Sequence, residues 1–311
     1  GFAVDIASDS AGSVLVLGWA PGSGTDFATI KYSMDGKKLW SKQYDGPGKG
    51  DGGLDDFPSD FVVKGDGSVI VVGSAAAADE LRDIVTLKYD TDGQRTLLLV
   101  ARGTTNLPSF GHALAVDNEG NTYVAGSAVR PDRRVVLIVQ YHPDGTKGWV
   151  REVGKPRTSY FASATQVDRN SNVLVCGSTL TSGAPAAVFM LLKIDRNGVL
   201  VWQTTHGDPT QGDSFANALA LDEAGNAYVT GASYREQNGF DWTTAKFDSS
   251  GKLVWSASEH GGDGDEALAL QVDAGGSVYV TGSTGMRDRS SAYHTVRYDA
   301  DGARLWAASF G

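Results

Sequence analysis

Six polar residues of this sequence could carry chemistry, and all of them lie near the start of a copy of an internal repeat. Together they offer a proton acceptor, two carboxylic acids, two hydroxyl groups and an amide: His112, Asp5, Asp60, Ser59, Ser163 and Asn217. An imidazole beside carboxylates can transfer protons in a hydrolase or a lyase. Because spacing along the chain does not show that the side chains meet, no catalytic residue is assigned. The six are predicted to form a polar binding site at the mouth of a channel.

A second candidate set consists of charges in long, variable loops. The acidic and basic members lie in separate loops: Asp51, Asp55, Asp263 and Asp265, and Arg130, Arg133 and Arg134. Opposite charges on one face of a protein can orient a polar partner. Two acidic loops, residues 44–56 and 260–266, are also rich in glycine, and their carboxylates and backbone carbonyls suit Ca²⁺. Since neither loop has EF-hand spacing, no cofactor is predicted, and calcium is the one candidate ion.

The repeat that positions these residues is marked by turns. A second-turn glycine occurs in every copy, and a tryptophan follows it by four residues in every copy except the second, which has Leu97. Each copy holds four short runs rich in Val, Leu, Ala, Thr and aromatic residues, which predict a four-stranded antiparallel meander. A first-turn glycine recurs every 51 to 55 residues, with Ser171 in its place in the fourth copy: Gly12, Gly67, Gly120, Gly225 and Gly276.

One such meander cannot bury both of its faces, so it must stack on its neighbours. The sequence therefore predicts an all-β chain, a β-propeller of six four-stranded blades. An incomplete seven-bladed ring is the alternative. We predict a single domain over residues 1–311, with repeats at approximately 1–54, 55–107, 108–158, 159–212, 213–264 and 265–311.

Two repeated side chains predict how the blades pack. The tryptophan near the start of each fourth strand, as at Trp40 and Trp255, is expected to wedge against the next blade. A cation near the end of the third strand, as at Lys31 and Lys246, is expected to pair with the repeated first-turn aspartate, as at Asp9.

The loops differ between the two ends of a blade. The turns after the first and third strands are short and nearly constant, whereas the second-to-third loops and the crossovers vary in length and charge, as in residues 73–83 and 231–241. Since function in repeat folds concentrates on variable loops over a rigid scaffold, we predict that any binding surface lies on the variable-loop face.

The strand and turn patterns resemble a known repeat family. LALDEAGNAYVTG (219–231), KFDSSGKLVW (246–255) and LAVDNEGNTYVAG (114–126) are similar to the bacterial SBBP-type β-propeller repeats. The resemblance implies a propeller architecture. It also implies a secreted, periplasmic or surface-anchored bacterial protein, of a kind that often has no known activity.

Net charge and the length of apolar runs limit the classes of partner that the chain could bind. The net charge of −10 makes the chain acidic and disfavours nucleic acid, which needs a basic face. No apolar run approaches the ~20 residues of a membrane span. The repeat chemistry without a catalytic cluster favours a non-catalytic binding or scaffold propeller, which presents its variable-loop face to a protein or glycan. The alternative is a hydrolase or lyase that uses the channel mouth around His112, Asp60 and Asp5.

Overall fold

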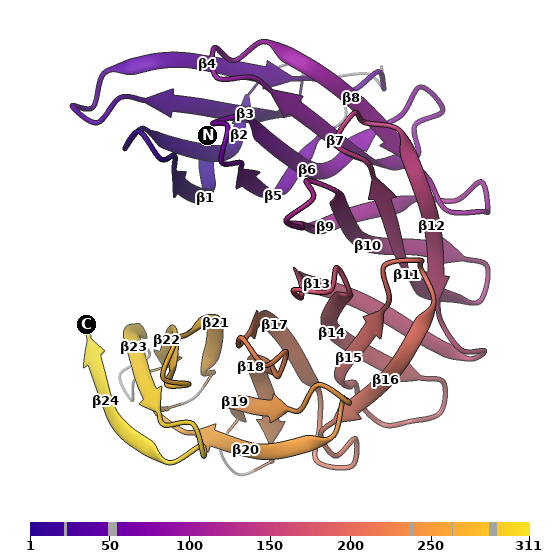
Figure 1. The fold of residues 1–311 in the computed structure, drawn as a ribbon. Helices are drawn as coiled ribbons and strands as arrows, with labels where there is room; N and C mark the ends of the chain where they lie inside the picture. Colours follow the sequence, from indigo (N-terminus) through magenta and orange to yellow (C-terminus); the bar gives the residue numbers. More distant parts are fainter. Residues whose placement is uncertain (22–23, 49–54, 237–238, 263, 286–290) are drawn as a thin grey trace. The chain divides into compact units, whose positions relative to one another are not determined.

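The computed structural model describes residues 1–21, 24–48, 55–236, 239–262, 264–285 and 291–311. Within these residues the chain forms six antiparallel sheets of four consecutive strands each and no helix (Figure 1). The predicted six four-stranded blades are thereby confirmed. The described part of the chain accordingly has no helix that could cross a membrane.

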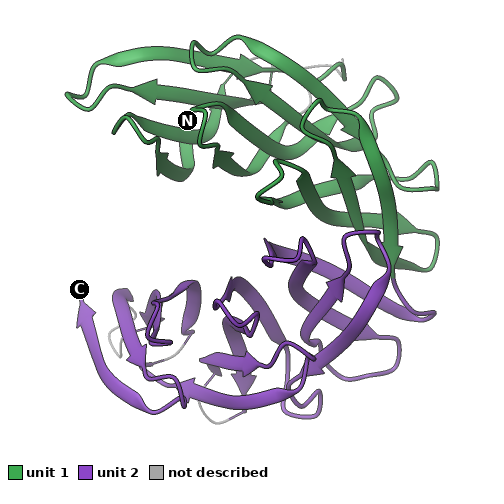
Figure 2. Cartoon of the chain, viewed as in Figure 1, with its two compact units in different colours: residues 1–153 green, residues 154–311 purple. Residues whose placement is uncertain are grey.

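The first three blades form one compact unit, Gly1–Val153, called unit 1 (green in Figure 2). Hydrophobic side chains of neighbouring blades interlock inside it, as Leu17, Val71 and Val85 do. Its strands are β1 (Phe2–Ser8), β2 (Val14–Pro21), β3 (Thr25–Tyr32), β4 (Lys38–Tyr44), β5 (Phe57–Val63), β6 (Val69–Ala76), β7 (Arg82–Tyr89), β8 (Arg95–Ala101), β9 (Ser109–Val116), β10 (Thr122–Arg130), β11 (Arg133–Tyr141) and β12 (Lys147–Val153).

The last three blades form a second compact unit, Gly154–Gly311, called unit 2 (purple in Figure 2). The single-domain organisation stays a prediction. The strands of unit 2 are β13 (Thr158–Val167), β14 (Val173–Thr181), β15 (Val188–Ile194), β16 (Leu200–His206), β17 (Ser214–Leu221), β18 (Ala227–Arg235), β19 (Gly239–Phe247), β20 (Leu253–Glu259), β21 (Glu266–Val272), β22 (Val278–Gly285), β23 (Ser291–Tyr298) and β24 (Arg304–Phe310).

The predicted tryptophan wedge is present within both units. The indole Nε1 of Trp40 in β4 donates to the carbonyl oxygen of Thr91 in the next blade at 3.0 Å. Trp202 and Trp255 make the same bond to the blades that follow them. A Cβ on Gly93 would lie 2.7 Å from the indole of Trp40, so the second-turn glycine is needed for contact between blades as well as for its positive φ.

The predicted pairing of the third-strand cation holds in two copies. Lys31 lies 2.9 Å from Asp9 and Lys193 lies 2.9 Å from Asp168. For Lys246 the prediction is wrong, because its Nζ donates to the carbonyl oxygen of Ala300 in the next blade. In this blade the hydroxyl of Tyr228, on the second strand, donates to the first-turn Asp222. It takes the place of the lysine ammonium group.

The first strand of every blade contains a β-bulge, which sets the direction of the side chains near its start. The register skips one residue in each: Val4, Ser59, His112, Ser163, Asn217 and Leu268. The second strand has a glycine opposite, and a Cβ there would lie 1.8 to 2.2 Å from a first-strand carbonyl oxygen. The bulge is therefore fixed by a repeated glycine.

Candidate functional site

The predicted polar residues all lie at or beside these bulges. In unit 1, Asp5 lies on β1, Ser59 and Asp60 on β5, and His112 on β9. The three strands contact one another in sequence order, so the structure brings these four residues onto adjacent strands. In unit 2, Ser163 on β13 and Asn217 on β17 occupy the corresponding positions, again on strands in contact.

Several of these polar groups join one blade to the next. The hydroxyl of Ser59 donates to the carbonyl oxygen of Gly111 at 2.8 Å, and the Oδ2 of Asp60 accepts the amide of Leu114 at 2.8 Å. These two bonds bracket His112. In unit 2, the amide nitrogen of Asn217 donates to the carbonyl oxygen of Ala267 at 2.9 Å, which repeats the bond made by Ser59. These hydrogen bonds thus connect the bulge in the first strand of one blade to the bulge in the next.

Burial shifts the pKa values of two of them in opposite directions, because it disfavours the charged form of each. Desolvation, with a smaller contribution from the charge of Asp5, raises the pKa of Asp60 to about 6, although two backbone amides oppose the shift. Desolvation, helped by the nearby Arg134 guanidinium, lowers the pKa of His112 to about 4. The imidazole is therefore neutral at pH 7. Within the described residues neither of its ring nitrogens has a hydrogen-bond partner, so His112 could accept a proton or a hydrogen bond.

A row of phenyl rings lies beside the polar residues. A phenylalanine stands two residues before the bulge in each of the first five blades, and we call these the phenyl row: Phe2, Phe57, Phe110, Phe161 and Phe215. Four of the five are exposed, by 38 to 69%. We did not predict this row from the sequence. The signal was nevertheless present, because the residue recurs at one place in the repeat, as the tryptophans do.

Guanidinium groups accompany the phenyl row in unit 1. The Cζ of Arg82 lies 4.9 Å from the ring centre of Phe57, and the Cζ of Arg134 lies 5.2 Å from that of Phe110. Arg82 is held in place, because its Nη1 donates to the carbonyl oxygen of Asp55 at 2.6 Å. The start of the first strands in unit 1 therefore presents apolar rings beside planar hydrogen-bond donors.

Most of the predicted loop charges are occupied by contacts inside the protein. The Oδ1 of Asp55 accepts the amide of Thr25 at 3.0 Å, Arg130 pairs with Glu152, and Arg133 pairs with Asp132. Asp265 is buried and accepts hydrogen bonds on both carboxylate oxygens. Asp51 and Asp263 lie outside the described residues. Of the predicted loop charges, Asp265 is therefore buried and Arg130 is paired with Glu152, and the role of the set as a binding surface stays a prediction.

Two clusters in the structure combine side chains that could ligate a metal ion. Asp26, Asp45 and Asp56 form one in unit 1, and Asp241, His260 and Asp265 form the other in unit 2. In the first cluster, burial and the neighbouring carboxylates raise the pKa of Asp26 and of Asp56. Like charges thus lie close together in a desolvated place.

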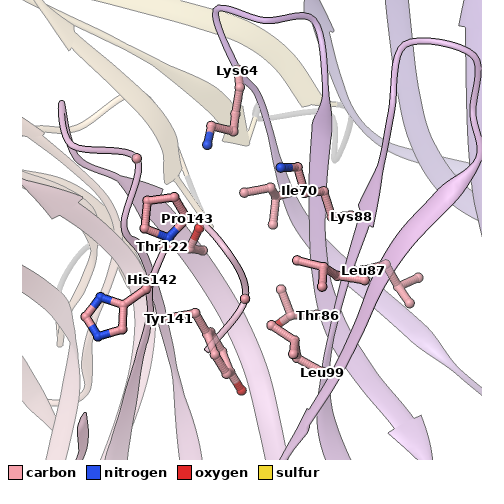
Figure 3. Close-up of a pocket in the computed structure, with 13 residues that line it drawn as sticks. Lys64, Ile70, Thr86, Leu87, Lys88, Leu99, Thr122, Tyr141, His142 and Pro143 are labelled. Carbon is pink, nitrogen blue, oxygen red and sulfur yellow. The ribbon is translucent and has the colours of Figure 1, made fainter. Parts of the chain in front are cut away.

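A small cavity lies between the second and third blades, at the constant-turn end (Figure 3). Lys64 and Lys88 lie at one end of it, and Thr86, Leu99 and Tyr141 lie toward the other. Its volume of about 20 Å³ holds a single water molecule. Thr86 and Tyr141 both line the cavity, and in the described part of the chain their buried hydroxyls have no hydrogen-bond partner. The cavity is too small for an organic ligand.

Comparison with known proteins identifies the fold and nothing finer. No protein-family model matches the chain, and no curated protein matches its sequence. The crystal structure of the polysaccharide lyase Uly1 matches over 99% of this chain and 81% of that chain, with a TM-score of 0.60 and 9% identity. The fold is a six-bladed β-propeller. A eukaryotic initiation factor matches over 99% of this chain and 88% of its own with 11% identity, but its TM-score of 0.38 supports no conclusion.

Proposed function

We propose that this β-propeller is a non-catalytic binding protein that holds a glycan against the phenyl row of unit 1. The observation that carries the proposal is the recurrence of phenyl rings on neighbouring first strands. Phe2 and Phe57 are exposed, and a guanidinium group lies over the ring of Phe57 and over that of Phe110. A sugar presents an apolar C–H face, which can stack on a phenyl ring, and hydroxyl or carboxylate oxygens, which can accept from guanidinium groups. Repeated rings suit a polymer with repeated sugars.

The hydrogen bonds of the polar residues favour binding over catalysis. Ser59, Asp60 and Asn217 are engaged with backbone groups of the next blade, which ties them to the scaffold. Exposed apolar rings that gather on a protein surface are typical of an interaction site. A glycan partner also agrees with a location outside the cytoplasm of a bacterium, which is part of this proposal. A protein partner on the same face is the competing occupant.

Affinity electrophoresis through gels that contain neutral or acidic polysaccharides tests the proposal. We expect at least one polysaccharide to retard the protein, and calorimetry with its oligosaccharide to give a binding constant. Phe57→Ala and Phe110→Ala should each weaken that constant about tenfold, equivalent to about 1.4 kcal/mol. Phe310→Ala is the matched control, because Phe310 is 79% exposed and lies outside the row. Equal binding by all three variants, or retardation by no polysaccharide, would overturn the proposal.

A hydrolase or lyase is the second candidate, favoured by one observation. His112 is neutral at pH 7 and half-buried, so its imidazole could accept a proton from a bound substrate. The similar fold of a polysaccharide lyase points to the same class of substrate. Release of reducing ends or of unsaturated sugars, abolished in His112→Ala, would support catalysis. Retardation without product release would support binding alone.

A further inference from the structure

Three blades carry a buried aspartate near the start of the third strand, and its Oδ1 has a nitrogen partner in two of them. Asp83 pairs through Oδ1 with the Nε of Arg102, and Asp241 pairs through Oδ1 with the Nδ1 of His260 at 2.8 Å. Asp26 is only 5% exposed, and within the described residues its buried Oδ1 has no hydrogen-bond partner. Blade 1 therefore lacks the nitrogen partner that Arg102 and His260 supply in the other two blades.

The missing group is a donor from the residue after the fourth strand. That position is Arg102 after β8 and His260 after β20, but in blade 1 it is Asp45 after β4. A carboxylate cannot donate, so it adds negative charge where the other blades place a nitrogen donor.

A third carboxylate completes the arrangement in blade 1. Asp56 precedes β5 and is fully buried, and its two oxygens accept the amides of Ala76 and Gly46. One oxygen from each of Asp26, Asp45 and Asp56 lies within 4.8 Å of the others. In blade 5, by contrast, Asp265 already accepts from Thr284 and three backbone amides.

We propose that Asp26, Asp45 and Asp56 bind one Ca²⁺ ion at the junction of blades 1 and 2. All three side-chain ligands are carboxylate oxygens, which hard cations prefer, and the set contains no nitrogen or sulfur ligand that would favour zinc. A divalent cation would balance most of the charge and give the Oδ1 of Asp26 a partner. It would do in blade 1 what the guanidinium of Arg102 does in blade 2.

The position of the ion predicts its effect. Its ligands come from β3, from the residue after β4 and from the residue before β5, so bound Ca²⁺ would fasten the crossover between two blades (Figure 1). This effect does not depend on the proposed glycan. A ligand that binds only the folded state stabilises it by an amount that grows with the logarithm of the ligand concentration over its dissociation constant, and this raises the midpoint of thermal unfolding.

Calorimetry and thermal unfolding of the whole chain, with CaCl₂ or with EDTA, test the site. Saturating Ca²⁺ should raise the unfolding midpoint of the native protein by about 4 °C or more over the EDTA sample. Asp26→Asn should lose this rise and the calorimetric signal. Asp241→Asn is the matched control, since Asp241 is the equivalent buried residue of blade 5, and it should keep both.

A second variant, Asp45→Arg, distinguishes loss of the calcium site from misfolding of Asp26→Asn. Asp45→Arg copies blade 2 by placing a guanidinium beside Asp26 and Asp56. It should fold, unfold in EDTA at or above the midpoint of the native protein, and no longer respond to Ca²⁺. An absent response in the native protein, or a full response in Asp26→Asn or Asp45→Arg, would refute the site. An equal response to Mg²⁺ at the same concentration would refute the assignment to calcium.

Discussion

Leu97 of β8 packs against Gly145 in the second turn of the next blade, where a Cβ would lie 2.8 Å from the leucine side chain. In the preceding junction Trp40 packs in the same way against Gly93 and also donates a hydrogen bond. Leucine is smaller than tryptophan and has no donor. A cavity of about 20 Å³ lies at this junction, and Leu97 and Gly145 are among the residues that line it.

Leu97→Trp should stabilise the protein by restoring the wedge. We expect a gain of about 1 kcal/mol in the free energy of unfolding, typical of filling a cavity and adding one hydrogen bond. The reverse change, Trp40→Leu, should remove about 2 kcal/mol. Urea unfolding followed by fluorescence measures both. If Leu97→Trp is as destabilising as Trp40→Leu, the two junctions are not equivalent.

Asp60→Asn should change how stability depends on pH. The folded-state pKa of about 6 lies above the ordinary value of 3.8, so the folded protein holds this proton where the unfolded chain has lost it. The contribution of Asp60 is fully present below about pH 4 and is lost as pH rises through 6, by at most about 3 kcal/mol. The difference in unfolding free energy between variant and native protein, measured from pH 4 to 7, should therefore move in favour of Asp60→Asn as pH rises.

His112→Phe should show the opposite slope. The folded-state pKa of about 4 lies below the ordinary value of 6.5, so the unfolded chain binds a proton that the folded protein does not. The contribution of His112 is present above about pH 6.5 and is lost as pH falls toward 4, by at most about 3 kcal/mol. Relative to the native protein, His112→Phe should gain stability as the solution is acidified. Parallel curves for the two proteins would mean that His112 titrates normally.

The strands, turns and blade number of this fold could be predicted from the sequence repeat. The side-chain contacts between neighbouring blades, apart from the tryptophan wedge, could not. Turn glycines and Trp40 recur at fixed spacing, so the six blades and their wedge follow from the repeat. The bond from Ser59 to Gly111 depends on a bulge in the first strand, and the repeated glycine that fixes this bulge lies on the paired strand, as Gly73 does. Asp26, Asp45 and Asp56 stand in the same places relative to their strands as Asp241, His260 and Asp265, but sequence alone did not show that these three strand ends meet, although the acidic loop itself had suggested calcium.

The glycine opposite each bulge gives the sharpest test of the first-strand geometry. A Cβ on Gly73 would lie 2.2 Å from the carbonyl oxygen of Phe57 and 2.7 Å from the Cα of Pro58, and backbone atoms of a paired strand cannot move apart without breaking the ladder. Gly73→Ala should therefore lower the free energy of unfolding by more than about 3 kcal/mol. Gly36→Ala is the matched control: its φ is +81° but a Cβ there meets nothing within 4 Å, so only about 1 kcal/mol should be lost. Urea unfolding of both variants separates steric conflict from backbone strain, and equal losses would show that the bulge can relax around an added methyl group.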